Sequence, residues 1–403
     1  MREPQDSYYH ILRKIYNERI ENNLETYNLI IPEYGIISSM IESKPGSPED
    51  YDEVREIYLE SLNQGITRFL EGYNIGFIKL HDAASDYIKT LLGNRLIKSY
   101  ELMMSEDHNI LKHIIKILFK RSTIVYYLYT NEPYFKYILG ELEYPVIENP
   151  FQDFKPDLNF FKENISENSL VIFSIPNIPL GHIDLNDLDK ILRILDDSGS
   201  YLLLDLSYIN LVFNYSSKIS YQRETVDKMI VELISILYNH RKRVIVTYSI
   251  NHSFFLDAPR IFITLIPRAI WKEKDFTSVI NLNRLNVNIS YELLYRLSVN
   301  SSKIIDFITK VYVMRYNDLY DRFKKYIHVP SKYFGGPYAY LNIKNSREIF
   351  NRCINRGLLV GYAPDYIPIN HGLIVSLLSL KYTVNDSIWS KAVDLLEKCI
   401  KES

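Results

Sequence analysis

Apolar residues along this chain follow two alternating patterns. Long segments carry them at the spacing of one helix face, and these segments predict helices over 8–20, 51–69, 110–119, 133–142, 184–195 and 225–238. Between them lie short runs rich in β-branched and aromatic residues. These runs predict buried strands at 124–129, 170–175, 201–206, 244–248 and 261–266.

The alternation itself predicts the fold class. Strands that are apolar on both faces and alternate with helices are typical of an α/β domain, in which helices cover both sides of a mostly parallel sheet. Such sheets bind their ligands at the carboxyl ends of the strands. The polar residues that directly follow the predicted strands are therefore the candidates for a functional site.

A second domain is predicted beyond Pro267, where the pattern changes. A long helical region covers 291–323, a Gly-Gly-Pro turn follows at 335–337, and strands and helices then alternate up to a last helix at 387–401. This mixture indicates an α+β domain. We predict three parts: an N-terminal arm over 1–50, a large α/β domain over 51–285 and a small C-terminal domain over 286–403.

Three polar segments follow predicted strands: Pro176–Gly181 (PNIPLG), Asp205–Tyr208 (DLSY) and Ser249–Arg260 (SINHSFFLDAPR). In order and spacing they resemble the core of the fold-type I pyridoxal-phosphate (PLP) aminotransferases, in particular histidinol-phosphate aminotransferase and threonine-phosphate decarboxylase. That family reads Pro-Asn-Asn-Pro-Thr-Gly, then Asp-Glu-Ala-Tyr, then Ser-x-Ser-Lys with an arginine eight residues after the lysine. The resemblance implies a PLP-transferase-like large domain, and residues 338–401 resemble the family's small domain.

The resemblance also implies roles for four residues. Asp205 lies where the family's acid keeps the pyridine nitrogen protonated, so that the cofactor ring can act as an electron sink. Tyr208 lies where a tyrosine donates to the ring hydroxyl. Ser249 and Arg260 lie at positions that contact the cofactor phosphate, for which the fork of an arginine is well suited.

Two further positions follow from the same resemblance. Asn177 is the first asparagine of the Pro-Asn-Asn-Pro motif and counts among the cofactor-binding positions. Tyr73 lies where a tyrosine reaches the phosphate of the partner subunit's cofactor. The resemblance therefore implies a dimer, either of identical subunits or with a related subunit.

The sequence departs from the family pattern at several positions. His252, eight residues before Arg260, stands where the family has its lysine, and imidazole has no primary amine with which to form a Schiff base. Ile178 replaces the second asparagine, and Ile374 falls where an arginine grips the substrate carboxylate. The phosphate turn falls at 105–107, where two carboxylates would repel a dianion although a helix N-terminus favours one.

Each candidate also has an ordinary structural explanation. Asp205 is either a site residue or a cap for the segment that follows, and Tyr208 is one of 34 tyrosines, many of which must simply pack. Arg260 is either a phosphate ligand or a surface arginine. His252 is either a neutral leftover of a lost site or a general base, because histidine transfers protons near neutral pH.

Other charged groups predict no separate site. Asp184, Asp187 and Asp189 do not have the spacing of a metal site, and Asp184 is expected to cap the helix that follows it. No metal is therefore expected. The short basic tract Arg241–Arg243 precedes a strand and is expected to be a solvated loop, with a smaller chance that it contacts an anionic partner.

Composition narrows the classes of function. The chain of 403 residues has 47 basic and 49 acidic side chains, so no binding to nucleic acid or to an anionic membrane is expected. Cys353 and Cys399 form no CxxC motif, which fits a reducing cytoplasm. The first nine residues are polar and no segment has the length and apolarity to cross a bilayer, so neither a signal peptide nor a membrane span is expected. We interpret the many Tyr, Ile and Asn residues as an archaeal-like composition.

Two interpretations of function remain open. In the first, the chain is a pseudoenzyme that keeps the aminotransferase fold, binds no cofactor and acts by binding a protein partner or a small ligand. In the second, it is an enzyme that binds PLP or pyridoxamine phosphate without a covalent bond and uses His252 as a general base. The first interpretation is preferred because several family positions have changed together.

Overall fold

The structure is a computed structural model. It describes residues 8–22, 24–29, 49–72, 75–106, 110–120, 122–127, 133–148, 151–152, 155–216, 218–254, 256, 259–271, 283–329, 333–365, 367, 369–377 and 386–402. Tyr73, for which a contact with a partner's cofactor was expected, lies outside the described residues, as does Asp107 of the expected phosphate turn.

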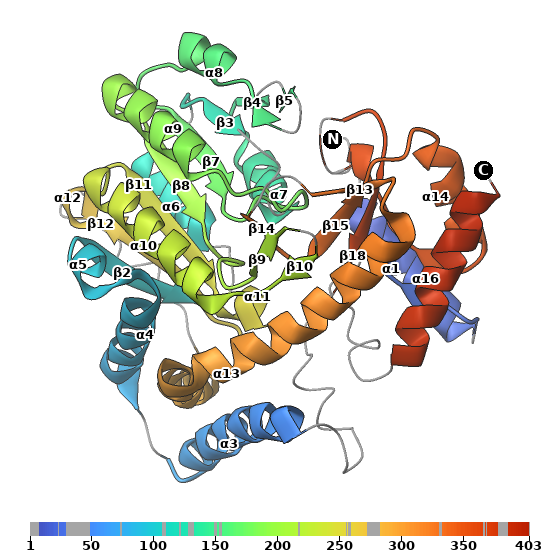
Figure 1. Ribbon diagram of the computed structural model, residues 1–403. Helices are drawn as coiled ribbons and strands as arrows, with labels where there is room; N and C mark the ends of the chain where they lie inside the picture. Colours follow the sequence, from blue (N-terminus) through green and yellow to red (C-terminus); the bar gives the residue numbers. More distant parts are fainter. Residues whose placement is uncertain are drawn as a thin grey trace.

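A seven-stranded sheet forms the centre of the large α/β unit (Figure 1). Its strands lie in the order β2 (Tyr100–Ser105), β12 (Phe262–Pro267), β11 (Val244–Ser249), β8 (Tyr201–Asp205), β7 (Leu170–Ser174), β3 (Val125–Tyr127) and β4 (Val146–Glu148). β12 is antiparallel to both neighbours, whereas the pairs from β11 to β4 are parallel. The prediction of a mostly parallel sheet is confirmed.

Helices cover both faces of this sheet, which explains why its strands are apolar throughout. On β7, Val171 and Phe173 pack into one apolar cluster with α9 (Leu185–Ser198) and α10 (Arg223–Asn239). Leu170 and Ile172 face the other side and pack into a second cluster with α6 (Ile110–Leu118) and α7 (Pro133–Leu142). Successive side chains of a strand point to opposite faces, so both sets must be apolar.

The C-terminal part has the predicted mixture of helix and strand. The long helix α13 (Arg284–Phe323) leads from α3 (Glu49–Leu70) and α4 (Gly76–Leu92) to a four-stranded sheet. This sheet has the order β13 (Ile327–His328), β15 (Tyr338–Leu341), β18 (Leu373–Ser376) and β17 (Gly361–Tyr362). The remaining elements of this part are α14 (Ser346–Asn355), β16 (Leu358–Leu359), the 3-10 helix η2 (Ala363–Asp365) and α16 (Asp386–Lys401). β16 pairs with β1 (Tyr27–Asn28), which follows α1 (Tyr8–Glu21), so the N-terminal segment packs on the C-terminal part.

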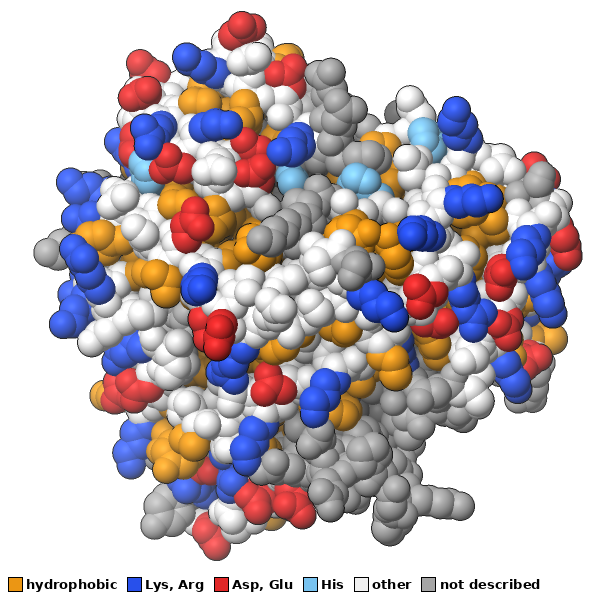
Figure 2. Space-filling view, viewed as in Figure 1, with side chains coloured by type: hydrophobic (Ala, Val, Ile, Leu, Met, Phe, Trp, Pro, Cys, Tyr) orange, Lys and Arg blue, Asp and Glu red, His pale blue; other side chains and the backbone are white. Residues whose placement is uncertain are grey.

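Shorter elements complete the description. They are α5 (Asn94–Ile97), β5 (Phe151–Gln152), β6 (Lys155–Pro156), α8 (Leu158–Asn164), β9 (Val212–Tyr215), β10 (Ile219–Ser220), α11 (Ile250–Phe254), α12 (Arg268–Trp271) and β14 (Tyr333–Gly335). No helix in the described part of the chain combines the length and the apolarity needed to cross a bilayer. Charges of both signs are interspersed over the face shown in Figure 2.

Candidate functional site

Asp205 is the last residue of β8 and lies at the carboxyl edge of the sheet. Its side chain is only 2% exposed. Its Oδ1 atom accepts hydrogen bonds from the Ser207 backbone N–H at 3.1 Å, the Ser207 hydroxyl at 2.6 Å and the Thr247 hydroxyl at 3.3 Å. Thr247 lies opposite Asp205 on β11. The carboxylate therefore ties the ends of two neighbouring strands together.

The same network continues into the short helix after β11. The backbone N–H of Ser249 donates to the Ser207 hydroxyl at 3.0 Å, and the backbone N–H of His252 donates to the Ser249 hydroxyl at 3.2 Å. The Ser253 hydroxyl donates to the Ser207 carbonyl at 2.5 Å. The rings of His252 and Tyr208 are stacked, with centroids 5.7 Å apart and an angle of 7° between their planes.

A pair of buried tyrosines lies next to this network, since Tyr248 stands between Thr247 and Ser249 on β11. The hydroxyl groups of Tyr248 and Tyr87 lie 2.8 Å apart, and the Asn210 amide donates to the Tyr248 hydroxyl at 2.9 Å. Burial raises the pKa of Tyr248 to about 12, so the phenol stays protonated. Sequence reasoning missed Tyr87 and Asn210. Tyr87 is 161 residues from its partner, and no local pattern marks such a contact.

The loop after β7 reaches the same edge of the sheet. The backbone N–H of Ile175 donates to the Asp205 carbonyl at 2.9 Å. Two residues later, Asn177 begins a tight turn in which its N–H donates to the His182 carbonyl at 2.9 Å and its carbonyl accepts from the Gly181 N–H at 2.6 Å. Asn177 is buried, so it lies next to the network but inside the protein.

The C-terminal part closes over this turn. Strand β14 pairs with β9, the Gly335 N–H donates to the Gly181 carbonyl at 2.8 Å, and the Gly336 N–H donates to the Leu211 carbonyl at 2.9 Å. A methyl group added to Gly336 would lie 2.7 Å from the Ile178 side chain. Ile178 therefore packs directly against the backbone of the C-terminal part.

Ile374, predicted at the position of a carboxylate-binding arginine, lies on β18 and is 1% exposed. It belongs to an apolar cluster that joins the two parts of the chain and consists of Leu180, Tyr340, Leu359, Ala363, Ile367 and Ile374. Hydrocarbon side chains therefore fill the surroundings of this position.

Two candidate positions lie apart from the network. Arg260 is exposed, and among the described residues it has no hydrogen bond or ion pair, although it lies two residues before β12 at the same sheet edge. Glu106, expected near a phosphate, accepts from the backbone N–H and the side-chain amide of Asn283, both at 2.9 Å. Asn283 in turn caps α13. The Glu106 carboxylate thus fixes the start of a helix.

Two histidines lie beside the site. Burial lowers the pKa of His182, and the positive charge of Lys155 lowers it further. Burial also lowers the pKa of His328 to about 4, with a smaller contribution from His182. The backbone of His182 forms an isolated antiparallel β-bridge with Phe334. His182 therefore lies where the C-terminal part meets the turn at 177–182. Both shifts favour the neutral imidazole.

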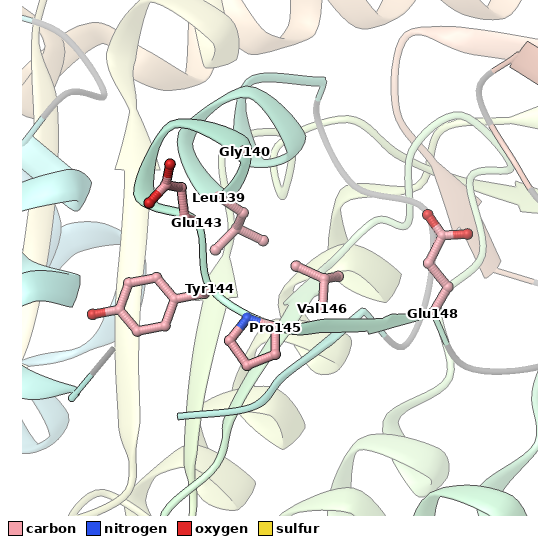
Figure 3. Close-up of a pocket in the computed structure, with 7 residues that line it drawn as sticks. All are labelled: Leu139, Gly140, Glu143, Tyr144, Pro145, Val146 and Glu148. Carbon is pink, nitrogen blue, oxygen red and sulfur yellow. The ribbon is translucent and has the colours of Figure 1, made fainter. Parts of the chain in front are cut away.

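Other features of the structure do not extend this site. A cavity of about 480 Å³ lies at the sheet edge formed by β4 and shares no residue with the network (Figure 3); its lining residues are Leu139, Gly140, Glu143, Tyr144, Pro145, Val146 and Glu148. Asp184 caps α9 by accepting from the Asp187 N–H at 3.0 Å, as predicted. Among the described residues, no group of three or more potential ligands is placed to hold a metal.

Comparison with known proteins gives a fold. No protein-family model matches this sequence, and no curated protein matches it. Among solved structures, a probable N-succinyldiaminopimelate aminotransferase from Thermus thermophilus superimposes with a TM-score of 0.71 and 13% identity, over 96% of this chain and 99% of that one. An aspartate aminotransferase from Thermotoga maritima gives a TM-score of 0.68 and 13% identity, over 97% and 96%.

A third structure contains the cofactor that the resemblance implies. The PLP-bound C–S lyase from Staphylococcus hominis gives a TM-score of 0.66 and 13% identity, over 93% of this chain and 88% of that one. Identities at this level establish the fold alone. The chain therefore has the fold of PLP-dependent aminotransferases.

The residues at the sheet edge can be tested against PLP. A Schiff base requires a primary amine. The three loop segments at this edge, residues 176–183, 205–211 and 249–261, contain no lysine. These segments therefore do not fit a cofactor held through a Schiff base, although they offer a carboxylate, a phenol and an imidazole.

Proposed function

We propose that this chain is an aminotransferase-like pseudoenzyme, which has lost transamination and acts by binding a protein partner or a small ligand. The observation that carries this proposal is His252. It follows β11, its imidazole stacks on Tyr208, and by the resemblance it corresponds to the family's lysine. An imidazole cannot replace the amine that lysine-dependent chemistry requires.

Three further features support the same proposal. Ile178 is packed against Gly336, Ile374 lies in an apolar cluster, and Glu106, at the expected phosphate turn, is a carboxylate engaged by Asn283. In the family these positions supply a ring contact, a substrate-carboxylate contact and a phosphate contact. A hydrogen bond to a charged group contributes about 1.5–3 kcal/mol, so losing them together would remove most of the free energy of binding.

We also propose that the chain forms a dimer, with an identical or a related subunit. Exposed apolar side chains occur on α13 and on the two helices that pack on it, among them Leu70 on α3, Ile78 on α4 and Val299 on α13. A dimer interface would bury such side chains. Leu70→Glu or Val299→Glu should convert a dimer to a monomer in sedimentation.

The free thiols of Cys353 and Cys399 fit our further proposal of a cytoplasmic location.

A second candidate function is an enzyme that binds PLP or pyridoxamine phosphate without a covalent bond, with His252 as general base. It is favoured by the hydrogen-bonded chain that links Asp205 and Ser249 to His252, by the stacked Tyr208, and by Arg260, which is exposed at the same sheet edge. By the resemblance, these residues correspond to the family's contacts with the ring nitrogen, the phosphate and the ring hydroxyl.

One experiment separates the two candidates. The purified protein is mixed with PLP, and separately with pyridoxamine phosphate, and its absorption spectrum and melting temperature are recorded. The pseudoenzyme proposal predicts no change with either compound at millimolar excess. A shifted cofactor band with a higher melting temperature would overturn it, and His252→Ala would then test whether the histidine acts in catalysis.

A further inference from the structure

We propose that the edge of the sheet opposite the candidate site binds single-stranded nucleic acid. Six basic residues from three segments meet there, around the amino ends of β2, β8 and β11 and the carboxyl end of the antiparallel β12. We call this surface the basic edge, and its members are Arg95, Lys98, Arg241, Lys242, Arg243 and Arg268. In Figure 2 the left margin of the molecule, where α5, α12 and the end of α10 lie, carries a row of blue side chains.

Contacts between these segments show that they lie side by side. Arg95 of α5 and Arg241, which follows α10, both pack on the ring of Tyr238, at 4.1 and 4.4 Å from its centroid. Arg243 packs on Tyr201 at 5.0 Å. Two guanidinium groups are thus held on one tyrosine, and a hydrogen bond with Arg95, together with the positive charges of both arginines, lowers the pKa of that tyrosine.

Arg268 joins the edge from the other side. Its backbone N–H donates to the Ser99 carbonyl at 3.0 Å, which places it beside Lys98 at the start of β2. Its side chain forms an ion pair with Glu101 at 3.1 Å. The other five members have no ion pair with any described residue, and the nearby carboxylate of Asp196 is engaged by His240 at 2.5 Å. The basic edge therefore carries an excess of positive charge in a chain whose net charge is −2.

Part of this charge has a structural use. Arg241 donates to the Tyr238 carbonyl at 2.7 Å and Arg243 to the Gly199 carbonyl at 3.0 Å, so they cap the ends of α10 and α9. Each of these bonds uses one of the five N–H groups of a guanidinium. Lys98 and Lys242 are exposed and have no such bond with the described residues.

The arrangement favours an extended polyanion over a single phosphate. The cations are spread along an edge and on separate elements, which suits a row of phosphates. Tracking of a backbone by a positive surface, with arginine planes that can stack on bases, is the common mode of binding single strands. The near-zero net charge of the whole chain gave no reason to expect binding to nucleic acid. The basic edge is a local excess of positive charge that the net charge does not reveal.

The test is fluorescence anisotropy of the full chain with labelled oligo-uridine and oligo-thymidine at several salt concentrations. We expect binding at low salt that weakens as salt rises. Lys98→Glu/Lys242→Glu should weaken it at least about tenfold and reduce the slope of log affinity against log salt by about 1.4. The control is Lys344→Glu/Lys391→Glu, two exposed lysines of the C-terminal part. It changes net charge equally and should retain affinity within about twofold.

Three results would overturn the proposal. They are no binding by the wild-type chain at low salt, an equal loss in both double variants, or binding to phosphatidylserine vesicles but not to either oligonucleotide. Far-ultraviolet circular dichroism of both double variants checks that each is folded. Neither pair of lysines lies in the candidate site, so failure of this proposal leaves the proposed function untouched.

Discussion

The two sides of the candidate site differ sharply in what surrounds their key residues. On the sheet side, Asp205 accepts three hydrogen bonds and is linked through Ser207 and Ser249 to the helix of His252. On the side of the C-terminal part, Ile374 lies among hydrocarbon side chains. The polar groups join the ends of neighbouring strands, whereas Ile374 is part of an apolar core.

This difference teaches that a retained motif is not evidence of a retained cofactor. The resemblance assigns Asp205 to the cofactor's ring nitrogen, but the hydrogen bonds that Asp205 accepts give it a structural role that needs no ligand. Ile374 makes only apolar contacts. A charged side chain buried at this position without a partner would cost free energy. Each of the following predictions tests one side of this comparison.

Ile374→Arg should have the largest effect. It would place a guanidinium in an apolar cluster and should lower the free energy of unfolding by about 4 kcal/mol or more. Urea unfolding measures this value, and Ile374→Val, expected to cost about 1 kcal/mol, is the control. A stable Ile374→Arg variant would mean that the position can still receive a carboxylate anchor, which would contradict the apolar side of the comparison.

Asp205→Ala should come next, at about 3 kcal/mol, because the donors of Ser207 and Thr247 would lose their acceptor inside the protein. Asp205→Asn keeps an oxygen at the same place and should cost clearly less. Both values come from urea unfolding without added cofactor. If Asp205→Ala unfolds like the wild type, the carboxylate has no structural task, and its retention would then favour a bound ligand.

Gly181→Ala should cost about 2 kcal/mol, since its φ is +75° and the new methyl group would lie 2.4 Å from the Gly335 carbonyl oxygen. Gly199→Ala is the matched control: its φ is +69°, but the nearest atom lies 3.9 Å away. It should cost about 1 kcal/mol, from the backbone conformation alone. Equal losses would show that the turn and the C-terminal part are not in tight contact.

At neutral pH the smallest effect is that of His328, which appears only on acidification. Burial holds its folded pKa at about 4, below the ordinary 6.5, so the unfolded chain binds the proton more readily. Stability from the neutral imidazole is therefore present above pH 6.5 and is lost as the pH falls toward 4. His328→Gln should remove up to roughly 3 kcal/mol of this pH dependence between about pH 7 and pH 4.5. We would measure the free energy of unfolding of the wild type and of His328→Gln between about pH 7 and pH 4.5. An equal decrease in both proteins would contradict the lowered pKa of His328.

The sequence was sufficient for most of the fold. Helix α9 was predicted together with its cap at Asp184, because the capping contact is local. Strand β7 was predicted because both its faces are buried and it is apolar throughout. Strand β2 was missed: YELMMS has no β-branched residue, and its partner β12 lies far along the chain. Helix α4, whose buried residues face inward at helical spacing, was missed as well.

The candidate site was predictable only in part. Order and spacing placed Asp205, Tyr208, Ser249 and His252 at one edge, and the structure brings these four together. That Arg260 is exposed could not be seen, since a side chain's contacts depend on residues far along the chain. The support from Tyr87 was invisible for the same reason.

The central claim is that more than the lysine has been lost. The most direct test is the variant His252→Lys, mixed with PLP, desalted and examined for a retained visible absorption band, with the wild-type chain as the blank for surface lysines. We predict no retained band beyond the blank, because Ile178 is packed against the C-terminal part and the expected phosphate turn carries the Glu106 carboxylate, which is engaged by Asn283. A band retained in proportion to protein, with a higher melting temperature, would show a site lacking only its amine and would contradict the account.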